Sequence, residues 1–406
     1  MTLPVHRWFR YSAGFSAAWA RDLISRAELP AGGLVFDPFA GSGTTLIAAQ
    51  SLGIRSAGIE QHEFVYRIAK AKLSWPDSGQ TLLDEAQQIL GLAREHATRR
   101  PPLTSPLLNR CYAPDALVRL EALKRAYFQI HDAAAAAELL WLAITSILRD
   151  CSGVGTAQWQ YLLPNKSKVR VLDPFEAFTE KIKMFCADMA AMAPYGRSHP
   201  EPQLVCADAR RIDESLDLHG RVHLVLTSPP YPNNYDYADA TRLEMTFWGE
   251  VERWGDLHDA VRKRLVRSCS QHTAAERLCL EALLQDPGLA PILKEITEVC
   301  RTLEVIRETK GGRKTYHTMV AAYFCDLARV WATLRHLCAA NARVCFVIGD
   351  SAPYGVYVPV DRWLGELAIA AGFVSYAFEK SRDRNTKWKN RKHRVPLKEG
   401  SLWVRG

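Results

Sequence analysis

The alternation of apolar and polar positions near the N-terminus predicts helices and strands in regular succession. An amphipathic stretch at 16–24 has the spacing of a helix that lies against a sheet. Short apolar runs at 34–36 and 55–60 are long enough for buried strands, and each is followed by a helical pattern, at 44–52 and 62–73. Strands that alternate with helices pair in parallel, so this part predicts a doubly wound α/β sheet.

The succession stops after this point and resumes only near residue 203. Residues 77–200 carry long helical patterns, such as 82–97 and 133–148, with almost no β-branched strand signal. We expect a mainly helical insertion, with 194–202 as the linker that returns to the sheet. Further strands are then expected at 203–207, 222–227, 343–348, 373–378 and 401–404, with the last two as a terminal pair, and helices at 319–337 and 360–371.

Composition bounds the class of protein without identifying it. The 406 residues are 48% hydrophobic and 24% charged, with a net charge of +8 that suits a polyanionic partner. No apolar run approaches the roughly 20 residues of a membrane span, and the N-terminus lacks a signal-peptide pattern, so we expect a cytoplasmic protein. The ten cysteines form no CxxC pair. We therefore expect free thiols and no metal site.

Two glycines follow the strand predicted at 34–36, in the stretch DPFAGSGTT (residues 37–45). Gly41 and Gly43 would let a ligand approach the backbone where the strand becomes a helix, whose first N–H groups are free to bind it. A turn that only caps the helix is the alternative. No lysine follows as in a P-loop, and Leu46 replaces the third glycine of a dinucleotide fingerprint, so both of those classes are disfavoured.

Two acids follow neighbouring predicted strands, where a nucleoside could meet them. Glu60 comes 17 positions after Gly43, where a carboxylate would accept hydrogen bonds from ribose hydroxyls. Asp208 ends the following strand and is placed to contact an adenine amino group. A solvated cap at a strand end is the alternative for Asp208.

A stiff turn with one hydroxyl and one aromatic ring follows the strand predicted at 222–227. Pro229 and Pro230 lack N–H groups and fix their backbone angles, which sets the carbonyl directions. Ser228 and the Pro229 carbonyl could accept hydrogen bonds from an exocyclic amine, and the Tyr231 ring could stack on its planar group. A simple loop stiffener is the alternative.

Together, DPFAGSGTT at 37–45 and TSPPY at 227–231 resemble the S-adenosylmethionine-dependent DNA amino-methyltransferases. The serine form of the second motif resembles the cytosine-N4 branch. The resemblance, which extends to 233–237, 347–351 and the N-terminal helix, covers some 200 residues in blocks. It implies a Rossmann-like methyltransferase fold with helices on both faces and a C-terminal antiparallel strand, S-adenosyl-L-methionine as cofactor, and a cofactor site formed by Phe15, Asp37, Phe39, Gly41, Gly43, Thr44, Glu60 and Asp208.

The resemblance further implies direct methyl transfer to a cytosine amine, with Ser228, Pro229, Pro230 and Tyr231 as catalytic residues. The target base would be flipped out of duplex DNA. No Pro-Cys dipeptide occurs, as a cytosine-C5 enzyme would require. Alternatives are adenine-N6 methylation, a catalytically silent DNA-binding subunit, and methylation of RNA or protein. A restriction-modification or orphan enzyme is expected, and a cognate restriction enzyme is a candidate partner.

Two clusters of basic residues are candidates for contact with DNA phosphates. The first lies between the last two predicted strands, and the second lies in the charged helical region at 241–318. A solvated charged face is the alternative for both. The residues selected are Arg382, Arg384, Lys387, Lys389, Arg391 and Lys392 from the first cluster, and Arg262 and Arg264 from the second.

The resemblance divides the chain into parts of one catalytic domain and two unmatched regions. The catalytic domain would comprise 1–76, 201–240 and 319–406. The unmatched regions, 77–200 and 241–318, are the candidates for DNA target recognition. The recognition sequence cannot be read from the chain.

Overall fold

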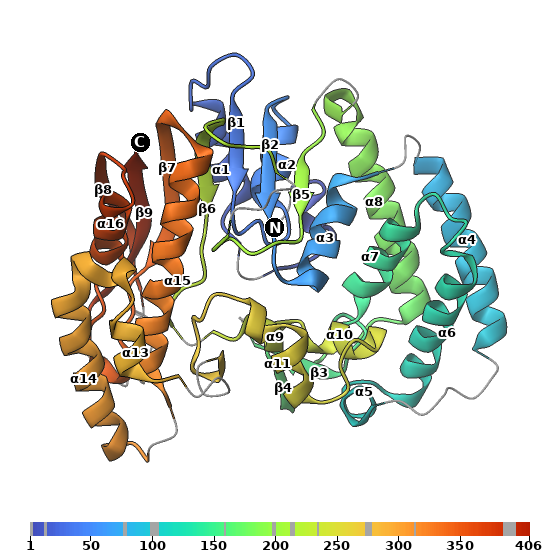
Figure 1. Cartoon of the computed structure of the whole chain (residues 1–406). Helices are drawn as coiled ribbons and strands as arrows, with labels where there is room; N and C mark the ends of the chain where they lie inside the picture. Colours follow the sequence, from blue (N-terminus) through green and yellow to red (C-terminus); the bar gives the residue numbers. More distant parts are fainter. Residues whose placement is uncertain are drawn as a thin grey trace.

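The computed structural model is an α/β structure built on one large sheet (Figure 1). Among the residues that it describes, no helix is long and apolar enough to cross a membrane. The described residues are 3–11, 14–75, 79–97, 105–157, 160–196, 200–211, 216–233, 235–272, 278–311, 314–384 and 395–406.

Seven strands form the sheet in the order β5-β2-β1-β6-β7-β9-β8. The first five are parallel, and β9 pairs antiparallel with both β7 and β8. This confirms the predicted fold: a mostly parallel sheet with a C-terminal antiparallel pair. The strands are β1 (Leu34–Asp37), β2 (Arg55–Ile59), β5 (Gln203–Val205), β6 (Val222–Thr227), β7 (Cys338–Gly349), β8 (Ser375–Arg384) and β9 (Leu397–Arg405).

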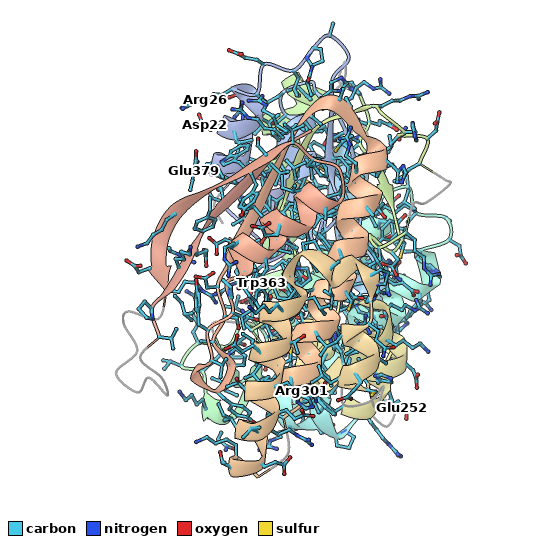
Figure 2. All side chains as sticks on the ribbon, turned by 60° about the vertical axis from the view of Figure 1, so that its left-hand side comes forward. Asp22, Arg26, Glu252, Arg301, Trp363 and Glu379 are labelled. Atoms are coloured by element: carbon cyan, nitrogen blue, oxygen red, sulfur yellow. The ribbon has the colours of Figure 1, made fainter. Side chains whose placement is uncertain are left out.

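Helices cover both faces of the sheet because the central strands are apolar on both sides. Val35 packs with α1 and α2, whereas its neighbours Leu34 and Phe36 belong to the cluster formed with α15 and α16. On that second face Trp363 of α16 is fully buried against Phe324 of α15 (Figure 2). The helices of these layers are α1 (Ala17–Ser25), α2 (Thr44–Gln50), α3 (Glu63–Leu73), α13 (Leu280–Leu284), α14 (Leu293–Thr309), α15 (Tyr316–Leu337) and α16 (Val360–Ala370).

A second body of helices packs beside α3, with its own apolar core (Figure 1). Fully buried Trp8 stacks on Phe185 of α8 and so attaches the N-terminal segment to this body. Asp188 strengthens the attachment, because it accepts hydrogen bonds from Val5 N and Trp8 Nε1. The helices are α4 (Gly79–His96), α5 (Pro106–Cys111), α6 (Pro114–Ile130), α7 (Ala137–Ile147) and α8 (Pro174–Gly196), with α9 (Tyr237–Ala240), α10 (Arg242–Trp248) and α11 (Leu257–Ala260) alongside.

The structure differs from the sequence-based expectation in several element boundaries. An antiparallel hairpin, β3 (Val154–Thr156) and β4 (Leu162–Ser167), lies within the region expected to be helical. Helix α8 continues through Pro194, where the return linker was expected to begin. Strand β7 starts five residues earlier than predicted, and β8 runs six residues further.

Candidate active site

Asp37, at the end of β1, holds the two sequence motifs together. Its carboxylate accepts hydrogen bonds from Thr45 Oγ1 at 2.6 Å and from Thr227 Oγ1 at 2.5 Å. Phe39 N donates to it as well, at 3.0 Å. Burial raises the pKa of Asp37 to about 6, and these three hydrogen bonds oppose the shift. The carboxylate of Asp37 therefore positions the start of both loops.

The glycine turn between β1 and α2 has the backbone that its residues predict. Gly41 and Gly43 both have positive φ, at 53° and 87°, and Gly43 is the N-cap of α2. A Cβ on Gly41 would lie 3.2 Å from Tyr11 Cε1, so this turn lies close under the N-terminal segment. A Cβ on Gly43 would instead contact Ala69 of α3. Gly41 thus faces the site, whereas Gly43 serves the packing of α2 on α3.

Glu60 connects the glycine turn with the end of β2. Its Oε2 accepts a hydrogen bond from Gly41 N and its Oε1 accepts one from His62 N, both at 2.8 Å. Burial raises the pKa of Glu60 to about 7, against these backbone hydrogen bonds. The carboxyl is therefore fixed in position and retains lone pairs for a hydroxyl ligand.

One cavity joins the predicted cofactor residues to the proline-rich turn. Among the predicted residues, it is lined by Phe15, Asp37, Phe39, Gly41, Thr44, Glu60, Asp208, Ser228 and Pro230. Gly43, Pro229 and Tyr231 are outside its lining. Nine predicted residues from different strands and loops thus converge on one space at the carboxyl edge of the sheet, as expected for a doubly wound fold.

The turn after β6 places a hydroxyl and a phenol at this edge. Ser228 Oγ donates a hydrogen bond to Val347 O at 3.1 Å and is also within hydrogen-bonding reach of the Tyr231 phenol, so its oxygen acts as an acceptor. The Tyr231 ring is partly buried, with the Arg384 guanidinium 5.4 Å from its centroid. Burial, aided by Glu399, raises the pKa of Tyr231 to about 12, so the phenol is neutral.

Asp208 and Phe15 both line the cavity, but they differ in how far other residues of the protein already occupy their side chains. The Asp208 carboxylate forms a bidentate ion pair with Arg210, at 2.8 to 3.1 Å. Phe15 is half-buried and meets Trp19 edge to face, with ring centroids 5.6 Å apart. The aromatic surface is therefore available, while the carboxylate is already paired.

Sequence reasoning missed part of this cavity. Tyr11 and Tyr237 line it, and Leu265 and Val266 approach from a loop far along the chain, next to Arg264, which was predicted only as a DNA contact. Tyr237 lies six positions after Tyr231 in the sequence. Its ring packs edge to face on the Tyr235 ring, with the centroids 4.6 Å apart, and this contact exists only in the folded chain. Tyr11 is buried against Gly41, and only the tertiary fold brings the two residues together.

The basic residues predicted to contact DNA have different surroundings. Arg382 is 67% exposed and pairs with Glu399, and Arg384 donates to Asp350 O beside Tyr231. Arg264 pairs with Glu63 and lines the cavity. The remaining members of the first cluster, Lys387, Lys389, Arg391 and Lys392, lie outside the described residues.

Arg262 requires a correction. Its side chain is 2% exposed and forms a bidentate ion pair with Asp236, with Nη2 2.7 Å from Oδ2, under the ring of Trp254. A guanidinium that is buried and neutralised in this way holds the loop after Tyr231 in place. Arg262 is therefore a structural residue and not a surface group that faces DNA phosphates.

Within the described ranges, one group of side chains has the composition of a metal site: Asp236, Cys269 and His272, whose ligand atoms all lie within 4.8 Å. Both oxygens of Asp236 already accept hydrogen bonds from Arg262. Burial raises the pKa of Cys269 to about 12, so its sulfur is a thiol. We therefore assign no metal to this group.

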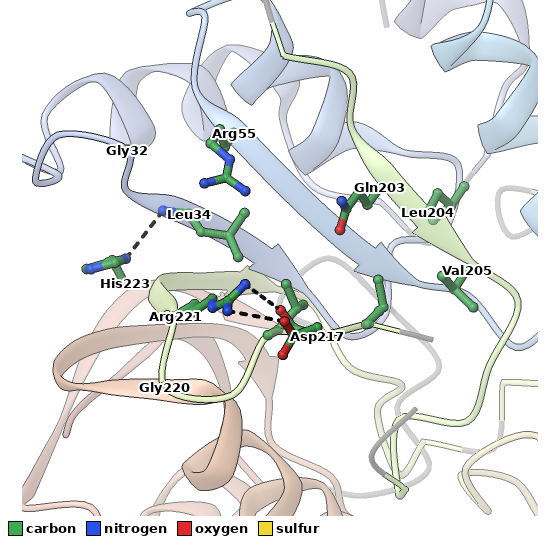
Figure 3. A pocket seen from close by; sticks show the side chains of 12 residues that line it. Gly32, Leu34, Arg55, Gln203, Leu204, Val205, Asp217, Gly220, Arg221 and His223 are labelled. Atoms are coloured by element: carbon green, nitrogen blue, oxygen red, sulfur yellow. Dashed lines mark hydrogen bonds and ion pairs between the residues drawn. The ribbon is translucent and has the colours of Figure 1, made fainter. Parts of the chain in front are cut away.

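A second cavity opens at the opposite, amino-terminal edge of the sheet (Figure 3). Its rim includes Arg55, and an ion pair between Arg221 and Asp217 lies beside it, at 3.1 Å. Leu34 N donates to His223 Nδ1 at 3.4 Å. None of the predicted site residues lines this cavity, and the chemistry expected of the chain lies at the other edge.

The mostly parallel sheet with its C-terminal antiparallel pair is consistent with a Rossmann-like methyltransferase. Residues 4–71 match the family model described as DNA methylase (N6_N4_Mtase). The chain is 24% identical to the type II methyltransferase M.BsoBI of Geobacillus stearothermophilus over 451 aligned positions, which cover 98% of this chain and 85% of that protein. It is 26% identical to the type II methyltransferase M.AvaI of Nostoc sp. strain PCC 7120 over 401 positions, with 91% and 79% covered.

These similarities extend over nearly the whole chain, including the regions that the motifs did not cover. In fold and in sequence, the chain resembles the S-adenosylmethionine-dependent DNA amino-methyltransferases. A DNA methyltransferase is the class of enzyme that they support.

Proposed function

We propose that this protein transfers a methyl group from S-adenosyl-L-methionine to the exocyclic N4 amine of a cytosine in duplex DNA, at a specific sequence. The observation that carries the proposal is the single cavity shared by the glycine turn and the Ser228–Pro230 turn. A cofactor held by the first would present its reactive group to a base held by the second. The names of M.BsoBI and M.AvaI support a place in a type II restriction-modification system.

The cavity fits a nucleoside cofactor in its chemistry. The fixed carboxyl of Glu60 can accept hydrogen bonds from ribose hydroxyls, and Phe15 and Phe39 provide apolar surface. The positive φ of Gly41 suits glycine, and an added Cβ would crowd the Tyr11 ring that lines the same cavity. S-adenosyl-L-methionine, when bound, supplies an activated methyl group.

The turn after β6 prepares the amine to react. Ser228 already uses its proton toward Val347, so its oxygen can only accept a hydrogen bond from an incoming amine. The Pro229 carbonyl is a second acceptor in a backbone that proline keeps stiff. Accepting both N–H groups draws the nitrogen lone pair out of the ring and directs it toward the methyl group, so that proximity supplies much of the acceleration.

The choice of cytosine over adenine rests on Ser228, since the resemblance associates serine at this position with the cytosine-N4 branch. The base must leave the duplex to reach the cavity. Tyr231 is the proposed stacking partner, and its neutral phenol suits contact with an uncharged base.

The test is to express the protein in a host without DNA methylation and to analyse the genomic DNA. We expect N4-methylcytosine in the nucleoside digest and a single sequence context in methylome sequencing. A host that carries the Ser228→Ala variant is the matched control. N6-methyladenine in the digest would contradict the base assignment, and the absence of any methylated nucleoside would contradict DNA methylation altogether.

A further inference from the structure

The β3–β4 hairpin ends in a basic surface that no predicted function has used. This hairpin surface consists of Lys166, Val169, Arg170 and Val171, at the end of β4 and in the segment that follows. All four are exposed, and Val169 is fully so. Two exposed valines, one of them 45% accessible, therefore flank an arginine on this surface.

The cations of this surface are free of acidic partners. Among the described residues, neither Lys166 nor Arg170 forms an ion pair or a side-chain hydrogen bond. Lys168, between them, is instead anchored, because its ammonium donates to Arg149 O. Asp173, which follows the segment, is paired with Arg119. The outward charge of the hairpin surface is therefore positive and not neutralised.

The other end of the hairpin is bound to the loop between Tyr231 and α9, which we name the catalytic loop because it follows the proposed catalytic turn. Asp236 N donates to Tyr161 Oη at 2.7 Å, and the rings of Tyr161 and Tyr235 lie 5.4 Å apart. Arg149 fixes the arrangement, with hydrogen bonds to Gln160 O at 2.6 Å and to Ala240 O at 2.7 Å. Figure 1 shows β4 in this position beside α9, which begins at Tyr237 and so adjoins the cavity.

The length of β4 then sets the distance between the surface and the reaction. Lys166 lies five positions after Tyr161, which is roughly 17 Å of extended strand. Because base pairs are stacked about 3.4 Å apart, this corresponds to roughly five base pairs of DNA. A strand anchored at the catalytic loop can therefore reach the duplex several base pairs from a flipped base.

We propose that the β3–β4 hairpin is a DNA-contacting element. Lys166 and Arg170 bind phosphates on one side of the target base, and the exposed valines contact the groove between them. This inference rests on the proposed function, since it assumes that duplex DNA is the substrate. Apolar side chains beside cations are suited to a nucleic-acid groove, where they meet thymine methyl groups or base edges.

The test compares Lys166→Ala/Arg170→Ala with Arg55→Ala/Arg405→Ala, which removes the same charge from exposed positions at the opposite, amino-terminal edge of the sheet. Binding of a fluorescent plasmid-derived duplex that contains the methylated sequence is measured by anisotropy from 50 to 200 mM salt. We expect the hairpin variant to lose about tenfold or more in affinity and its salt slope to fall by about two, since each phosphate contact contributes about one. The control variant should keep both values.

Calorimetry with S-adenosyl-L-methionine and urea unfolding check that the hairpin variant is folded, and Val169→Asn provides a charge-neutral variant. We expect Val169→Asn to reduce the preference for the methylated sequence over a scrambled duplex while the salt slope is unchanged. Equal affinity and slope in the hairpin and control variants, with the wild type active, would overturn the hairpin proposal alone. A wild-type protein that binds no duplex DNA would overturn the proposed function as well.

Discussion

Asp37 shows how one buried carboxyl can determine the geometry of two loops. Thr45 and Thr227 both donate to it, and they lie in the two motifs that the sequence separates by some 180 positions. The resemblance assigned Asp37 to the cofactor. The structure places it on the cavity wall, with its oxygens turned to the two threonines. Its contribution is to hold the glycine turn and the Ser228 turn at a fixed separation.

Ser228→Ala removes the hydroxyl that would accept a hydrogen bond from the amine, and Tyr231→Ala removes the proposed stacking ring. We expect the turnover number to fall by at least 100-fold in each, because alignment of the amine is lost. Cofactor affinity should survive, since neither side chain belongs to the glycine turn. Single-turnover methyl transfer and calorimetry measure the two quantities. Rates equal to wild type in both variants would refute the catalytic assignment.

Glu60 gives the stability of the protein a pH dependence that a single variant can isolate. Its pKa is raised from 4.5 to about 7 in the folded state, so the folded state binds more protons than the unfolded state between these values. Its contribution therefore stabilises the fold at low pH and is lost as pH rises. The Glu60→Gln side chain does not titrate, so the variant lacks this pH-dependent contribution to the unfolding free energy. We expect the unfolding free energy of the variant, relative to wild type, to increase by about 2 kcal/mol from pH 5 to pH 8.

Urea unfolding at the two pH values measures this difference. A constant offset between Glu60→Gln and wild type would show that the carboxyl has its ordinary pKa. The part of the difference that does not change with pH measures the lost hydrogen bond. A glutamine side chain has one acceptor oxygen, so it can accept from Gly41 N or from His62 N but not from both.

At the scale of elements, Arg149 is the connection between the hairpin and the catalytic loop. It forms a bidentate ion pair with Glu244, which is 1% exposed, with Nε 2.5 Å from Oε1. Arg149→Leu would leave this carboxylate buried without a partner. We expect a loss of about 3 to 5 kcal/mol in unfolding free energy. Arg149→Leu/Glu244→Leu should recover part of it, and urea denaturation of both compares them. A loss below about 1 kcal/mol in the single variant would be incompatible with the buried pair.

The strand boundaries show which parts of the sheet the sequence could predict and which depend on pairing in the folded chain. The expected span of β6 is correct and β1 extends one residue further, because buried parallel strands are continuous apolar runs. The start of β7 carries the sequence CAANA (residues 338–342), which has little strand signal. The hairpin is short and its second strand ends in polar residues, so only pairing with β3 makes it a strand.

The residues of the candidate site also divide into those that the sequence could predict and those that depend on the tertiary fold. Gly41, Glu60 and Ser228 could be selected because each follows directly from a strand end, and the structure brings them to one cavity. The burial of Arg262 could not be predicted, because its partner Asp236 is 26 positions away and the pairing exists only in the folded chain. The contribution of Tyr11 to the cavity is hidden for the same reason.

At the scale of the whole molecule, the cavity is enclosed by segments from distant parts of the chain, so cofactor binding should stabilise the fold as a unit. At 100 times the dissociation constant, S-adenosyl-L-methionine should add about 2.7 kcal/mol to the unfolding free energy. For a chain of this length we expect a rise in Tm of about 3 °C. Differential scanning fluorimetry measures it. Ser228→Ala should keep the shift and Glu60→Ala should lose it, and no shift in the wild type at millimolar cofactor would contradict the cofactor assignment.

The order of the strands places β5 and β8 at the two edges of the sheet. A sheet that does not close leaves unpaired backbone groups at each end, and such edges recruit other chains into aggregates. Here one end is β5, which is only three residues long. The other is β8, whose final half carries Glu379, Lys380, Arg382, Asp383 and Arg384. Brevity at one edge and charge at the other oppose the addition of a further strand, so the C-terminal pair that completes the sheet also protects it from aggregation.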